Sequence, residues 1–123
     1  MPRDYRLYLD DILQSIEQIQ AYLEGMAYEQ FEADARTVDA VVRNLEILGE
    51  AARNLPDAVK TDAPQIEWRK VVGMRNLLVH RYFGINTRVV WDIVQTQVKP
   101  LYTACRTALE RKPETSGGSD GPA

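Results

Sequence analysis

The chain has 123 residues, enough for one domain with a single core, and its 45% apolar and 27% charged residues are typical of a globular protein. No apolar run approaches the ~20 residues of a membrane span, and the charged first residues predict no signal peptide. The single cysteine, Cys105, excludes an internal disulfide and predicts a reducing compartment, the cytoplasm. Its apolar neighbours at helical spacing favour a buried core residue over a nucleophile.

The net charge of −3 by itself disfavours nucleic-acid binding, but the charges are unevenly distributed. Residues 68–91 contain five basic residues and no acidic one, which leaves ten basic and eighteen acidic residues elsewhere. Such a stretch indicates a local anion site. A solvated helix face would have the same composition, so charge alone leaves both interpretations open.

The first half of the chain predicts two long helices. The first is expected over residues 2–24, with Gly25 just past its end. Its apolar stripe consists of Ile12, Ile16, Ile19 and Leu23. A short connection through Tyr28 and Phe31 leads to the second helix over residues 34–54, which Pro56 ends because proline cannot continue a helix.

The second half predicts two further helices. Residues 56–65 form a loop with at most one helical turn, and the third helix spans 66–79 or slightly more. Gly84 and Asn86 mark a turn, and Asn86 or Thr87 caps a fourth helix that runs to residue 112, with a bend at Pro100. No segment has the pattern of a strand. We therefore expect an all-α fold, an antiparallel bundle of four main helices over residues 1–112, followed by a disordered tail at 113–123.

Polar side chains gather at the end of the third predicted helix, in residues 73–83. Asn76 and His80 are four residues apart and therefore neighbours on a helix, where the amide can orient the imidazole. Arg75 and His80 lie about 140° apart on a helix of 3.6 residues per turn, so one chain presents them poorly to a single target. A two-fold axis beside this helix could bring Arg75 of one chain near His80 of another.

The chemistry that suits such a group is RNA cleavage. Histidine can take the proton of a ribose 2′-hydroxyl or give one to the leaving oxygen, and arginine stabilises the charge on phosphorus. No metal is needed when the 2′-hydroxyl is the nucleophile, and DNA lacks that group. The residues also permit plainer roles: a structural His80, an Arg75 paired with Glu46 or Glu50, and core aromatics at Tyr82 and Phe83.

The sequence resembles the HepT-like branch of the HEPN superfamily over about residues 3–110. The family signature, Arg-x4-His-x-Tyr, is present from Arg75 to Tyr82. Further similar elements are Trp68, Gly73-Met74-Arg75-Asn76, Leu45-Glu46-Ile47-Leu48-Gly49-Glu50-Ala51 and Trp91. The combination of the signature with a Gly-Glu-Ala element in a helical chain is more specific than the Arg/His spacing alone.

The resemblance implies a HEPN-like homodimer with a composite site at its interface, and a metal-independent endoribonuclease that acts as the toxin of a type VII toxin–antitoxin system. It implies Arg75, His80 and Asn76 as catalytic residues and no cofactor of the chain's own. The implied antitoxin is a minimal nucleotidyltransferase that uses ATP and Mg²⁺ to attach AMP to Tyr82. Glu50 and Arg81 are candidate supporting residues, and Gly49 is expected to allow close helix packing.

Two other functions remain open at this stage. The chain could be a non-catalytic helical adaptor that docks a nucleotidyltransferase and holds its substrate, because the same basic stretch and dimer would serve that role. It could also be a purely structural interaction domain. An RNA-cleavage assay separates the first of these from the ribonuclease.

Overall fold

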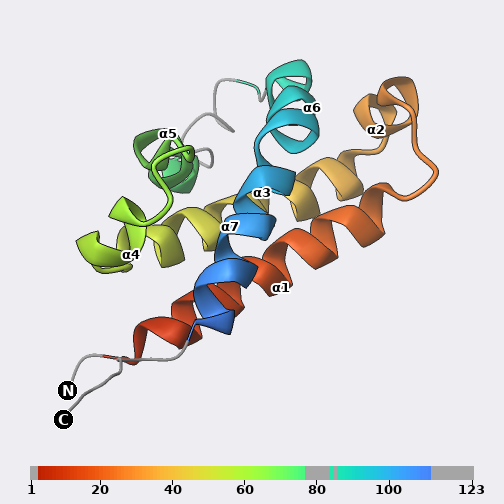
Figure 1. Cartoon of the computed structure of the whole chain (residues 1–123). Coiled ribbons are helices and arrows are strands. Elements are labelled where there is room, and N and C mark those ends of the chain that lie inside the picture. The colour runs from red at the N-terminus through yellow and green to blue at the C-terminus, as the bar shows by residue number, and fades with distance from the viewer. Residues whose placement is uncertain (1–2, 77–83, 85, 112–123) are drawn as a thin grey trace, which may run out of the picture.

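The computed structural model describes residues 3–76, 84 and 86–111, and every regular element within them is helical (Figure 1). In chain order the helices are α1 (Tyr5–Leu23), α2 (Tyr28–Ala33), α3 (Ala35–Arg53), α4 (Asp57–Thr61), α5 (Trp68–Gly73), α6 (Thr87–Thr96) and α7 (Val98–Glu110). The all-α fold class predicted from the sequence is therefore confirmed. The predicted tail at 113–123 lies outside the described residues.

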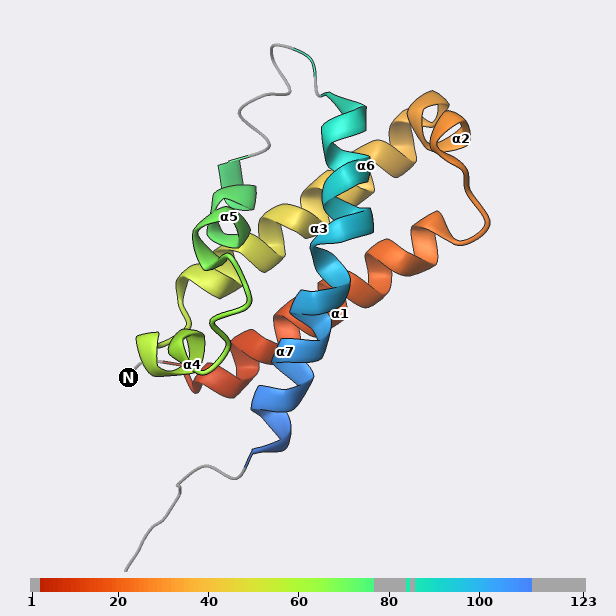
Figure 2. The same ribbon diagram turned by 45° about the horizontal axis from the view of Figure 1, so that its top comes forward.

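The long helices α1 and α3 form an antiparallel pair, against which α2, α5 and α7 pack (Figures 1 and 2). The Asp4 side chain caps α1 by accepting from the Arg6 amide at 2.9 Å, and Asp34 caps α3 by accepting from the Thr37 amide at 3.1 Å. Gly25, with φ of 78°, lies just past the end of α1. Both helices lie within about three residues of the predicted bounds.

The hydrophobic core lies between α1, α3 and α7. Its fully buried side chains include Ile12, Ile16, Ile19, Leu45, Leu48, Leu101 and Cys105. Ile12, Ile16 and Ile19 belong to the apolar stripe predicted for the first helix. Each fully buried aliphatic side chain contributes about 1.5–3 kcal/mol to the free energy of folding. Cys105 is a core residue, as predicted, and burial raises the pKa of its thiol to about 12.

The predicted fourth helix is two helices, separated at Gln97. Asn86 caps α6 as expected, accepting from the amides of Arg88 and Val89 at 3.0 and 3.2 Å. Pro100 has no N–H, and its ring would collide with the carbonyl of residue 96 in a continuous helix. The break at Gln97 places Pro100 in the first turn of α7, where a missing donor costs little.

Two other predicted bounds were wrong. The connection through Tyr28 and Phe31 contains the short helix α2, whose buried Phe31 packs against Trp91 of α6. Of the α-helix predicted over 66–79, only residues 68–73 form an α-helix, and residues 74–76 form a 3₁₀ turn. Residues 77–79 lie outside the described part of the chain. In the part of the chain that the structure describes, no helix is long and apolar enough to span a membrane.

Candidate active site

The candidate site is built where α5 meets the second half of α3. Trp68 is the first residue of α5. Its indole N–H donates to the carbonyls of Lys60 and Ala63, each at 3.1 Å. These bonds fasten the start of α5 to the end of α4. Val71 and Met74 are buried on the side of α5 that faces α3, which leaves Arg75 and Asn76 exposed at the surface.

Gly49 sets the distance between α3 and the segment that carries Arg75. A Cβ placed on Gly49 would lie 2.7 Å from the Arg75 amide nitrogen and 3.0 Å from the Val71 carbonyl oxygen. Both are backbone atoms, which no side-chain rotation can move away. The close packing predicted for Gly49 is therefore confirmed, and it places the Arg75 backbone directly on α3.

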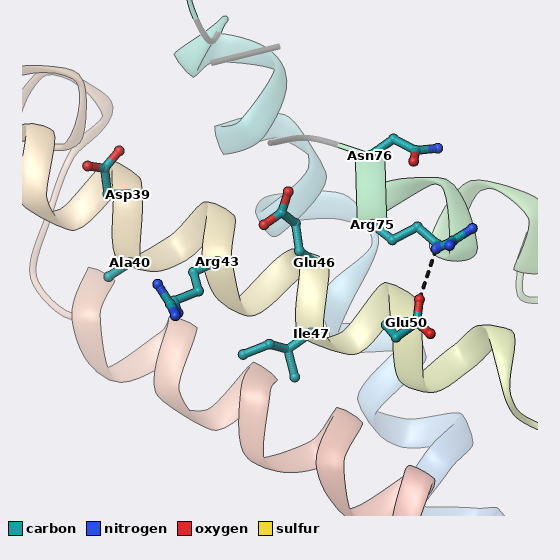
Figure 3. A pocket seen from close by; sticks show the side chains of 8 residues that line it. All are labelled: Asp39, Ala40, Arg43, Glu46, Ile47, Glu50, Arg75 and Asn76. Carbon is teal, nitrogen blue, oxygen red and sulfur yellow. Dashed lines mark hydrogen bonds and ion pairs between the residues drawn. The ribbon is translucent and has the colours of Figure 1, made fainter. Parts of the chain in front are cut away.

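The Arg75 side chain extends toward α3 and forms an ion pair with Glu50. Its Nε–H donates to Glu50 Oε1 at 2.9 Å, so the predicted pairing of Arg75 with an acidic residue is confirmed for Glu50 (Figure 3). Arg53 binds the same carboxylate, with Nη2 2.7 Å from Oε2 and Nε 3.3 Å from Oε1. Hydrogen bonding and charge from Arg53, then from Arg75, hold the pKa of Glu50 below its usual value, although partial desolvation opposes this shift.

Arg75 and Asn76 form one edge of an open groove of about 670 Å³ along the exposed face of α3 (Figure 3). Its lining consists of Asp39, Ala40, Arg43, Glu46, Ile47, Glu50, Arg75 and Asn76. Ile47 is an unusual lining residue because it is a large apolar residue that is 45% exposed. Arg43 has no ion-pair partner among the described residues, and the groove carries both signs of charge.

The structure brings three of the predicted site residues together: Arg75, Asn76 and Glu50. Asn76 points away from the Arg75–Glu50 pair (Figure 3). His80, Arg81 and Tyr82 lie outside the described residues. The predicted helical face shared by Asn76 and His80, and the 140° between Arg75 and His80, assumed a continuous α-helix. Because His80 lies outside the described residues, both arguments stay predictions.

Sequence reasoning missed Arg53 and the groove residues Arg43 and Ile47. Arg53 follows Glu50 by three residues on a helix, a spacing at which opposite charges pair, so its contact with Glu50 was predictable. Ile47 lay within the motif used for recognition, but its exposure depends on what covers α3. Among the described residues, no cluster of three His, Cys, Asp or Glu side chains could hold a metal ion.

Comparison with known proteins shows the family of the chain. Residues 12–108 match the model of the ribonuclease HepT-like family. The chain belongs to this family. The matched range begins in α1 and ends in α7, so it includes the whole α3–α5 unit that presents Arg75. The HepT-like family resemblance found in the sequence is thereby confirmed.

Relatives of this HepT-like chain carry ribonuclease names. “Probable ribonuclease HepT” of Thermococcus cleftensis is 41% identical over 82% of the chain and 92% of the relative. “Putative RNase MJ0127” of Methanocaldococcus jannaschii is 40% identical over 80% of the chain and 82% of the relative. “Putative RNase TTE0752” of Caldanaerobacter subterraneus is 35% identical over 87% of the chain and 96% of the relative. No solved structure matches the chain significantly.

Proposed function

We propose that this chain is a metal-independent endoribonuclease and the toxin of a type VII toxin–antitoxin system, acting in the cytoplasm. The observation that carries the proposal is the presentation of Arg75. Its backbone is fixed on Gly49, its Nε is held by Glu50, and the side chain is 41% exposed at the edge of a groove. An arginine presented in this way suits the binding of an RNA phosphate. Family membership and the ribonuclease names of the relatives support the same activity.

In the proposed reaction the ribose 2′-oxygen attacks phosphorus, and the bond from phosphorus to the 5′-oxygen breaks. His80 takes the proton of the 2′-hydroxyl or supplies one to the leaving oxygen. Arg75 binds the phosphate and stabilises the charge that develops on it, while Asn76 orients the site. Because the nucleophile belongs to the RNA, this step needs no metal-bound water.

The proposed enzyme is a homodimer with a composite site, and the groove supports this. Its mixture of acidic and basic residues suits a protein surface better than a polyanion. Ile47 lies on the exposed face of α3, and a two-fold axis beside it would bring Ile47 of one copy against Ile47 of a second copy. Such a dimer would also supply two copies of His80, one for each proton transfer.

The proposed control point is Tyr82, to which a minimal nucleotidyltransferase antitoxin would attach AMP with ATP and Mg²⁺. Each AMP adds a phosphodiester charge and an adenosine close in sequence to Arg75. The phosphate would compete with RNA for the arginine, and the adenosine would occupy the substrate's place. Modification should therefore stop cleavage without unfolding the protein.

Cleavage of RNA in the presence of EDTA, compared between the wild-type chain and His80→Ala, tests the proposed activity. Cleavage by the wild-type chain but not by His80→Ala supports the proposed activity. No cleavage by either protein contradicts it.

A further inference from the structure

A cluster of three charged side chains joins α3 to the segment that carries Arg75. Glu50 lies at its centre and receives hydrogen bonds from Arg53, three residues further along α3, and from Arg75, twenty-five residues away. The side chains of all three residues are between 41% and 48% exposed. The cluster is therefore a feature of the surface, at the edge of the groove, and not of the core.

Fold stability alone does not explain this cluster. Exposed ion pairs contribute only about 0–1 kcal/mol each. The backbone of Arg75 is already fixed by its contact with Gly49 and by the burial of Met74. What the backbone contacts leave open is the direction of the long Arg75 side chain, and the bond to Glu50 fixes that direction.

The atom of Arg75 that Glu50 binds is informative. The guanidinium group is planar, so a hydrogen bond at Nε restricts the orientation of the whole group. Such a bond leaves Nη1 and Nη2 available as a pair of donors. Among the described residues, Arg75 donates through Nε only. The two terminal nitrogens match the geometry of two phosphate oxygens, for which arginine forms paired hydrogen bonds.

Arg53 gives the cluster its net positive charge. A carboxylate bound to Arg75 alone would cancel the attraction of that arginine for a phosphate. With Arg53 included, two positive charges oppose one negative charge. The same contacts hold the pKa of Glu50 below its usual value, so the carboxylate stays ionised across the neutral range in which a histidine titrates.

We propose that Glu50 is a positioning residue, which holds Arg75 by its Nε so that the two terminal nitrogens face the scissile phosphate of RNA. The inference rests on the proposed ribonuclease function and adds that this function requires Glu50. Glu50 does not contact the substrate, and its effect passes through the orientation of Arg75.

The test compares three variants. Glu50→Ala removes the acceptor and should lower kcat by about 10–100-fold, because a small misplacement of a catalytic group has effects of this size. Glu50→Gln keeps an acceptor oxygen for Nε and should recover most of the lost kcat. Glu67→Ala is the matched control, since Glu67 forms a comparable exposed pair with Lys70 at 3.0 Å. All three should keep their melting temperature within about 4 °C of the wild type.

A second measurement does not depend on activity. The Nε–H signal of Arg75 in an NMR spectrum, assigned by its loss in Arg75→Lys, should exchange slowly with water in the wild type and in Glu67→Ala. It should exchange rapidly in Glu50→Ala. Equal exchange in wild type and Glu50→Ala would overturn the inference whatever the RNA assay gives, as would an unchanged kcat in Glu50→Ala. A protected signal in a chain that cleaves no RNA would instead contradict the proposed function.

Discussion

Gly49 of α3 lies against the backbone of Arg75, so closely that a Cβ on Gly49 would meet the Arg75 amide nitrogen at 2.7 Å. Gly49→Ala should therefore push α3 and the 74–76 turn apart and destabilise the protein by about 1–3 kcal/mol. Chemical denaturation followed by circular dichroism measures this change.

Gly73→Ala is the control for that experiment. Among the described residues, a Cβ on Gly73 would have no atom within 4 Å outside its own stretch of helix, and Gly73 ends α5 with an ordinary φ. Since alanine favours helix over glycine by up to about 1 kcal/mol, this variant should be as stable as the wild type or more so. Equal losses in the two variants would show that the close contact does not restrict residue 49.

The exposed Ile47 should lie in the interface of the proposed homodimer. Ile47→Asp would bury a charge there, so the dimer should dissociate at least about tenfold more readily, which corresponds to ~1.4 kcal/mol. Leu7→Asp is the matched control, because the two residues are similarly exposed, Leu7 at 44% and Ile47 at 45%. Leu7 lies in α1, away from the groove. Sedimentation velocity at micromolar concentration should show a dimer for the wild type and for Leu7→Asp. A monomeric wild type, or an Ile47→Asp variant that dimerises normally, would contradict the interface.

Cys105 should be chemically inert in the folded protein. Burial raises the pKa of its thiol to about 12, so almost no thiolate is present at pH 8. Iodoacetamide should label the protein in urea but not in buffer. The unfolded thiol loses its proton near its ordinary pKa of 9.0, so the contribution of this group to stability is complete below pH 9 and decreases above it. Rapid labelling of the folded protein would mean that α7 opens readily.

Tyr82 should accept AMP from the proposed nucleotidyltransferase antitoxin. Incubation with the nucleotidyltransferase, ATP and Mg²⁺ should raise the mass of the chain by one or more AMP units, and Tyr82→Phe should abolish the gain. A gain that persists in Tyr82→Phe would place the modification on another residue. A modified chain that still cleaves RNA would contradict the proposed control, even with Tyr82 as the acceptor.

The parts of the fold that the sequence predicted best are those determined by local chemistry. The start of α3 follows from the capping side chain of Asp34, and the end of α1 follows from Gly25. The buried stripes follow from the 3.6-residue period. Pro100 predicted a bend in the fourth helix. The break occurs at Gln97, and this position depends on how Val98 and Leu101 pack in the core, which the local sequence does not determine.

The candidate site was likewise predicted from the sequence only in part. The motif identified Arg75, and the acidic residue that binds it was narrowed to Glu46 or Glu50. Choosing Glu50 required the packing of α5 on α3, a contact between residues more than twenty positions apart. The end of α5 at Gly73 was missed for a similar reason: apolar residues continue past it in the sequence, while the 3₁₀ turn coincides with the backbone contact on Gly49.

The central claim is that this chain cleaves RNA with its own side chains. The most direct test incubates the purified chain, freed of any partner, with total RNA in EDTA, beside His80→Ala of verified helical content. The wild type should cleave, and His80→Ala should be slower by about 10²–10⁴-fold, the usual contribution of a general acid–base group. Equal rates for the two proteins, or no cleavage by the wild type, would contradict the claim.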